Sequence, residues 1–181
     1  MKNYNKYHMV SALFRCICAL VPVATACFWI FLDKMPALVT SNNVPIIENP
    51  SYLIAHITAS EKLIAFLCSL LPSAVVMLIF YQLSVLFKNY AKQEVFILAN
   101  AKIFRRLGVL LFSWLVAGWA YNVLFGLLLS TTVAPNVSES MIYLTVSGMD
   151  FSIAVTAMIV VMIAGVMDKA CQIHDENLHT I

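Results

Sequence analysis

The sequence predicts an all-α membrane protein with four transmembrane helices and an amphipathic cytoplasmic helix between the second and third spans. Its composition is the first observation behind this prediction: 62% of the 181 residues are hydrophobic and 11% are charged, whereas soluble domains carry about 25% charged residues. A soluble fold of this length could not bury so much apolar surface, so lipid must solvate much of the chain. The second observation is that four apolar stretches each have the length that crossing a bilayer requires. We expect them to form a single membrane domain over residues 1–181, because the chain is too short for a second domain.

The apolar stretches lie at about residues 10–32, 63–87, 107–133 and 145–167. The first contains one charged residue, Arg15, and the second and third contain none. The fourth ends before Asp168, but two starting points are open for it. A start at residue 151 leaves Asp150 outside the span, whereas a start at residue 141 includes it. The number of spans is therefore better defined than the beginning of the fourth.

The lysines and arginines predict the orientation of the chain, because cytoplasmic loops carry an excess of positive side chains. Nine of the 11 lie before or within the first stretch, between the second and third, or after the fourth. These nine are Lys2, Lys6, Arg15, Lys88, Lys92, Lys102, Arg105, Arg106 and Lys169. We therefore expect both termini and the middle loop in the cytoplasm. The first stretch is expected to remain as an anchor, because its apolar run continues to residue 32, past the small residues 24–27 that faintly resemble a cleavage site.

The segment from Lys88 to Arg106 links the second and third spans and predicts an amphipathic helix. Apolar residues such as Ile103 and Leu107 recur there at helical spacing, while basic residues fill other positions. Such a helix lies in the headgroup layer beside anionic lipid. The ordinary positive-inside pattern explains the same charges, and both explanations stay open. The candidate face for a partner or for lipid consists of Phe96, Asn100, Lys102, Arg105 and Arg106.

No pattern in the sequence indicates a catalytic, metal or cofactor site. The chain has no glycine-rich phosphate loop, nucleophile elbow or zinc-protease motif. None of its four histidines lies in the middle of a predicted span, and its five cysteines form no Cys-x-x-Cys pair. We therefore predict that the protein is not an enzyme, has no cofactor and does not bind nucleic acid directly.

Two polar residues fall in or beside the predicted spans. Asn122 lies near the middle of the third span, with Gly118 and Gly126 one turn to either side, which suits a close helix contact with an interhelical hydrogen bond. Asp150 has two interpretations. Inside the fourth span it would be the only intramembrane acid, of the kind that marks proton or ion paths. If the span begins at residue 151, Asp150 caps the helix at the outer surface, and the preceding Gly148 favours this second interpretation.

Two segments resemble a bacterial family of four-helix membrane proteins, domain of unknown function 2975. The first is VFILANAKIFRRLG between the second and third spans, whose matching residues are Phe96, Asn100, Arg105, Arg106 and Gly108. The second is the acidic tail that ends in Thr180 and Ile181. The resemblance implies four helices but no established activity. Members are often encoded beside a short helix-turn-helix regulator, and this neighbourhood implies a sensing or sequestering role.

The chain departs from the family pattern at three positions. The family usually has a glycine near Gln93, a small hydroxyl residue at the place of Ile97 and a glutamate at the place of Ala99. Any role of that glutamate therefore does not carry over to this chain.

Two functions follow as hypotheses. In the first, the chain is a non-enzymatic membrane protein that binds a cytoplasmic regulatory partner through its basic loop and its tail. In the second, it is a small transporter or channel subunit, homo-oligomeric, that uses Asp150 and Asn122. Membrane lipid contacts the chain in both.

Overall fold

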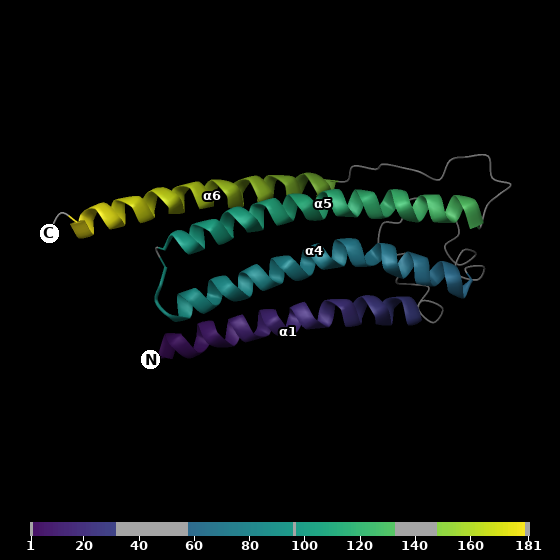
Figure 1. Cartoon of the computed structure of the whole chain (residues 1–181), viewed down its shortest axis with the longest axis horizontal. Coiled ribbons are helices and arrows are strands. Elements are labelled where there is room, and N and C mark those ends of the chain that lie inside the picture. Colours follow the sequence, from purple (N-terminus) through teal and green to yellow (C-terminus); the bar gives the residue numbers. More distant parts are fainter. Residues whose placement is uncertain (1, 32–57, 96, 133–147, 180–181) are drawn as a thin grey trace. The chain divides into compact units, whose positions relative to one another are not determined.

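The protein forms four α-helices and, within residues 2–31, 58–95, 97–132 and 148–179, no strand. These ranges are the residues that the structure, a computed structural model, describes (Figure 1). In chain order the helices are α1 (Lys2–Ile30), α4 (Ala59–Ala91), α5 (Leu98–Thr132) and α6 (Gly148–His179). The prediction of an all-α chain with four long helices is confirmed.

Each helix is long and apolar enough to cross a membrane. The qualifying parts are Lys6–Ile30, Ala59–Ala91, Leu98–Leu128 and Met149–Ile173. A helix is the form that such a run takes in lipid, because it satisfies the backbone N–H and C=O groups within one segment. Both α4 and α5 extend beyond the apolar stretches that the sequence predicts, into the basic segment between them.

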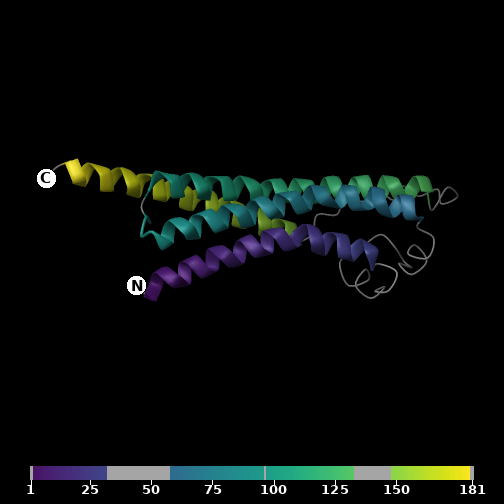
Figure 2. The ribbon, with the colours of Figure 1, turned by 60° about the horizontal axis from the view of Figure 1, so that its bottom comes forward.

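In the basic segment, the residues from Leu98 onward form the first turns of α5, so the helix expected to lead into the third span is part of α5 itself. Helix α4 continues to Ala91, and α5 starts at Leu98 and runs unbroken to Thr132, so a short connection joins the two helices. Figures 1 and 2 both show this short connection. The apolar spacing of Ile103 and Leu107 has another cause: both side chains are buried against α4. Both side chains therefore contribute to the protein core.

The described helices belong to two compact units, and every helix except α6 contributes to both. Unit 1 comprises Met1–Leu20, Val75–Val116 and Val146–Ile181, and unit 2 comprises Val21–Ala74 and Ala117–Thr145. Unit 1 therefore contains the α4–α5 turn and all of α6. Of the described helices, α1, α4 and α5 each contribute a segment to unit 2.

In unit 1, α5 packs against both α4 and α6. Leu86 of α4 forms a buried cluster with Ile103 and Leu107 of α5, and Val160 of α6 packs on it. The first part of α1 contacts α4 through a pair of small buried residues. The Ser11 hydroxyl lies 2.9 Å from the Ser84 carbonyl oxygen, and the Ser84 hydroxyl lies 3.1 Å from the Ser11 carbonyl oxygen. Small side chains of this kind let two helix backbones approach closely.

In unit 2, aromatic side chains dominate the packing. Trp29 of α1 and Ala65 of α4 are buried together, and Phe125 of α5 packs against them with its ring centroid 6.1 Å from that of Trp29. The Trp29 indole N–H donates to the Ser69 hydroxyl at 3.0 Å. The contact therefore combines a large apolar surface with one satisfied polar group.

Candidate functional site

One buried amide, that of Asn100, closes the turn between α4 and α5. Asn100 is 0% exposed. Its amide nitrogen donates to the carbonyl oxygens of Glu94 at 2.7 Å and Val95 at 2.9 Å. Its amide oxygen accepts a hydrogen bond from the Asn89 side chain at 2.8 Å. Because carbonyls outside a helix need other donors, this single side chain fixes the turn and joins it to the end of α4.

The backbone at the end of α4 forms a Schellman cap. The Glu94 N–H donates to the Asn89 carbonyl at 3.2 Å, and the Gln93 N–H donates to the Tyr90 carbonyl at 3.0 Å. Gln93 has a φ of 64°, the left-handed conformation that this cap requires and that glycine adopts most easily. Glutamine at this position therefore adopts a backbone conformation whose conformational free energy is lower for glycine.

Beyond the turn, α5 is joined to α6 by a close approach and an ion pair. A Cβ atom on Gly108 would lie 3.1 Å from the Ala157 carbonyl oxygen of α6 and would collide with the Val161 side chain. Glycine at this position therefore allows the two helices to touch. About one turn earlier, Arg105 donates to Asp168 at 2.8 Å, and the Arg105 side chain remains 64% exposed.

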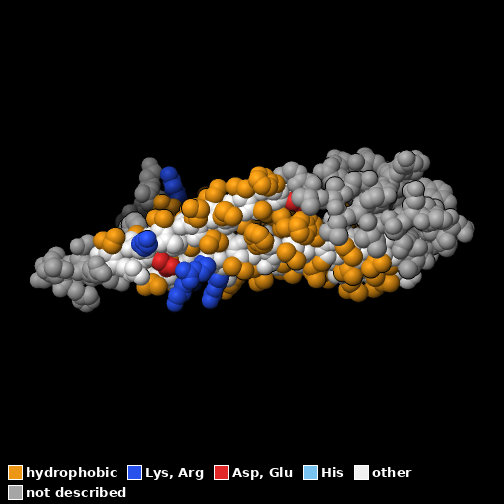
Figure 3. Space-filling view, turned by 90° about the horizontal axis from the view of Figure 1, so that it is seen from above, with side chains coloured by type: hydrophobic (Ala, Val, Ile, Leu, Met, Phe, Trp, Pro, Cys, Tyr) orange, Lys and Arg blue, Asp and Glu red, His pale blue; other side chains and the backbone are white. Residues whose placement is uncertain are grey.

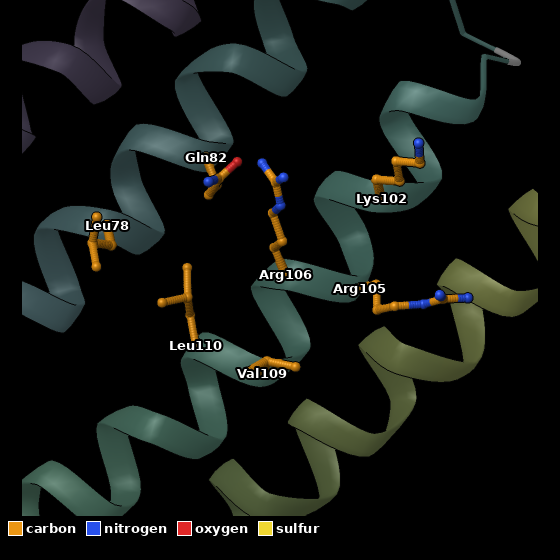
Figure 4. A pocket seen from close by; sticks show the side chains of 7 residues that line it. All are labelled: Leu78, Gln82, Lys102, Arg105, Arg106, Val109 and Leu110. Carbon is orange, nitrogen blue, oxygen red and sulfur yellow. The ribbon is translucent and has the colours of Figure 1, made fainter.

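A pocket of about 410 Å³ lies between α4 and α5, where the two helices leave the turn. Its cationic lining comes from Lys102, Arg105 and Arg106, and the rest comes from Gln82, Leu78, Val109 and Leu110. In Figure 4, the Arg106 side chain extends toward Gln82 of α4, whereas Arg105 turns toward α6. The space-filling view in Figure 3 shows Lys and Arg side chains gathered beside an acidic one, with hydrophobic side chains on the surrounding surface. The site is basic, open and next to apolar surface.

The sequence model of the family described as "Protein of unknown function (DUF2975)" matches residues 40–181. The chain belongs to this family. The resemblance carried by the α4–α5 segment and the tail is confirmed. No curated protein and no solved structure matches the chain.

The structure gives a physical role to several residues that match the DUF2975 pattern. Asn100 closes the turn, Arg105 pairs with α6, and Gly108 allows the α5–α6 contact. Phe96 lies outside the described residues. Two of the positions where this chain departs from the pattern lie in the same α4–α5 turn. Gln93 holds the left-handed position, and Ile97 immediately precedes α5, where a small hydroxyl side chain would cap the helix.

The structure brings together three of the predicted face residues and separates another from them. Lys102, Arg105 and Arg106 line one pocket, but Asn100 has no exposed surface and does not belong to the face. Asn100 can be buried because its amide nitrogen and its amide oxygen both have hydrogen-bond partners within the turn. Sequence reasoning missed Leu78 and Gln82, because no feature of α4 indicates which part of α5 it will contact.

Neither of the two residues of the transport hypothesis lines the pocket. Asn122 is exposed on α5, and a Cβ atom added to Gly118 would meet nothing within 4 Å. The close helix contact expected at this stripe is therefore not made at Gly118, whereas Gly108 does make such a contact. Asp150 lies in the first turn of α6 and is half-buried. The helix starts before it, at Gly148, so Asp150 lies within the first turn and does not precede the helix.

No group of three or more His, Cys, Asp or Glu side chains suitable for holding a metal comes together in the described part of the chain. The cationic lining of the pocket presents hydrogen-bond donors and no acceptor on its guanidinium and ammonium groups, which suits an anion.

Proposed function

We propose that the chain is a non-enzymatic protein of the bacterial inner membrane that binds a cytoplasmic protein with an acidic surface. Five exposed cations around the α4–α5 turn carry this proposal. They are Lys88, Lys92, Lys102, Arg105 and Arg106. Among the described residues, Glu94 and Asp168 are the acids close to them in sequence or by contact. An excess of exposed positive charge at one turn attracts acidic surfaces and accelerates their association.

The proposed sidedness rests on contacts within unit 1. The Tyr7 and Tyr90 rings lie with their centroids 6.4 Å apart, which brings the start of α1 beside the end of α4. The pair between Arg105 and Asp168 brings the start of α5 beside the C-terminal part of α6. The basic turn, the start of α1 and the later part of α6 would then face the same compartment. The positive-inside rule makes that compartment the cytoplasm.

The turn suits recognition because its backbone is fixed before any partner arrives. Asn100 and the Schellman cap hold the segment between Asn89 and Val95 by side-chain and backbone hydrogen bonds. A preorganised surface loses less conformational entropy on binding than a flexible loop does. The cations beside it would therefore act as a fixed pattern of charge.

Site-specific photo-crosslinking of the full chain in bacterial cells tests this proposal. p-Benzoylphenylalanine replaces Val95, which is exposed on the turn, and a second strain carries it at Phe112, which is exposed farther along α5. We expect a discrete adduct with a cytoplasmic protein from position 95 and none of the same mass from position 112. The adduct should disappear in the Lys88→Glu/Lys92→Glu variant and persist in Lys62→Glu, which changes a cation at the opposite end of α4.

Two results would overturn the proposal. One is an adduct that survives Lys88→Glu/Lys92→Glu, because the cations would then be irrelevant to binding. The other is an adduct whose only protein component is a second copy of the chain. Equal amounts of each variant in the membrane fraction, with equal thermal unfolding in detergent, exclude loss of folding as the cause.

A further inference from the structure

The pocket between α4 and α5 has a polar end and an apolar end. Gln82, Lys102 and Arg106 lie at the end nearer the turn, whereas Leu78, Val109 and Leu110 lie farther along the same two helices (Figure 4). Leu78 is 50% exposed and Val109 is 59% exposed, so the apolar end is open to a ligand. The charge-free apolar run of α5 begins at Leu107, directly after Arg106, so the polar end would lie at the level of lipid headgroups.

The two cations at the polar end are available for a ligand. No acidic side chain lines the pocket. Arg105 turns toward α6 and pairs with Asp168. Lys102 and Arg106 are exposed, and in the described part of the chain neither makes a hydrogen bond or an ion pair. An arginine guanidinium matches the geometry of a phosphate group, and a lysine adds a second positive charge.

The geometry points to a binding site for an anionic phospholipid of the leaflet on the side of the α4–α5 turn. The headgroup phosphate would lie between Lys102 and Arg106, with the Gln82 amide as a further donor. The glycerol and the start of an acyl chain would lie along Leu78, Val109 and Leu110. This order of polar and apolar contacts is the order of groups in the lipid itself.

The apolar end distinguishes a lipid from other anions. A free phosphate would fill the polar end alone and would leave three apolar side chains in contact with water. An acidic protein side chain has too short an apolar stem to reach along both helices. A volume of about 410 Å³ accommodates a headgroup and glycerol together. The inference does not depend on the proposed protein partner, because the lipid would bind the isolated chain.

Native mass spectrometry of the purified full-length protein in a non-ionic detergent tests the inference. The protein is titrated with phosphatidylglycerol and, separately, with phosphatidylcholine of identical acyl chains. We expect a preference for phosphatidylglycerol. Lys102→Gln/Arg106→Gln should weaken phosphatidylglycerol binding roughly thirty-fold, since each basic residue near an anionic lipid contributes about a factor of five. Lys88→Gln/Lys92→Gln, which removes two exposed cations outside the pocket, should leave the affinity unchanged.

Three outcomes would overturn the inference. Equal retention of the two lipids would show that the headgroup charge is not recognised. Unchanged affinity in Lys102→Gln/Arg106→Gln would place the lipid elsewhere. Complete displacement of the lipid by inorganic phosphate or glycerol phosphate at equal concentration would show a site for a free anion.

A second variant keeps the test valid if the double glutamine variant unfolds. Lys102→Arg/Arg106→Lys keeps both charges and should keep the preference for phosphatidylglycerol, whereas the single substitution Lys102→Gln at an exposed residue should reduce it about five-fold. Because the partner test changes Lys88 and Lys92 and this test changes Lys102 and Arg106, failure of one proposal is distinguishable from failure of the other.

Discussion

Unit 1 and unit 2 differ in how deeply the polar contacts between their helices are buried. The three described residues that are polar and buried all lie in unit 1, and they are Ser11, Ser84 and Asn100. In unit 2, the buried cluster is Trp29 with Ala65, and the hydrogen bond from Trp29 to Ser69 is only partly buried. A buried hydrogen bond has one geometry, whereas apolar contacts accept side chains of similar size. Unit 1 is therefore the more narrowly specified of the two, and it carries the basic turn.

Two glycines of α5 show the same difference. Gly108 in unit 1 lies against the backbone and a side chain of α6, but around Gly118 in unit 2 there is open space. Both residues interrupt an apolar helix in the same way in the sequence. Only the first is required for helix packing, so the two units should respond differently to matched substitutions.

The largest difference is expected between two asparagines of α5. Asn100→Ala leaves the Glu94 and Val95 carbonyls and the Asn89 amide without their partner, and should lower the free energy of unfolding by about 3 kcal/mol. Asn122→Ala, at an exposed residue of unit 2, should change it by less than about 0.5 kcal/mol. Unfolding of each variant in dodecylmaltoside micelles by added dodecyl sulfate, followed by circular dichroism, measures both. Equal effects would contradict the assignment of Asn100 as the clamp of the turn.

The glycine pair should change stability in opposite directions. Gly108→Ala forces α5 and α6 apart at Ala157 and Val161 and should destabilise the protein by about 1–3 kcal/mol. Gly118→Ala adds a better helix former in open space and should stabilise it by about 0.5–1 kcal/mol. The same micelle unfolding experiment compares them. If Gly108→Ala proved as stable as the parent protein, the α5–α6 contact would not be close.

The smallest effect is expected at the cap of α4. Gln93→Gly removes the cost of a left-handed conformation for a residue with a Cβ atom, and should stabilise the protein by about 0.5–1 kcal/mol. The matched change Glu94→Gly, one residue later and also exposed, gains no such relief and should lower stability or leave it unchanged. Thermal unfolding in detergent measures the difference. A fall in stability for Gln93→Gly would argue against the Schellman cap.

Some of the site followed from the sequence and some did not. The cluster of Lys102, Arg105 and Arg106 was predicted, because basic residues at one segment are visible without a structure. Asn100 was wrongly placed on the same face, since helical spacing alone does not show that its amide is consumed by Glu94, Val95 and Asn89. The helix expected between the second and third spans is continuous with α5, and the spacing of Ile103 and Leu107 reflects contact with α4.

The sequence by itself determined the four long helices, since an apolar run in lipid satisfies its backbone groups only by forming one. It also determined the family, through residues spread over 40–181. Only the tertiary structure decided which helices meet at Gly108, which cations face Gln82 and Leu78, and which asparagine is buried. The physical reason is that α4 and α5 are apolar on nearly all sides. Their sequences therefore do not indicate which face of each helix packs against another helix. Contacts between individual side chains determine that face.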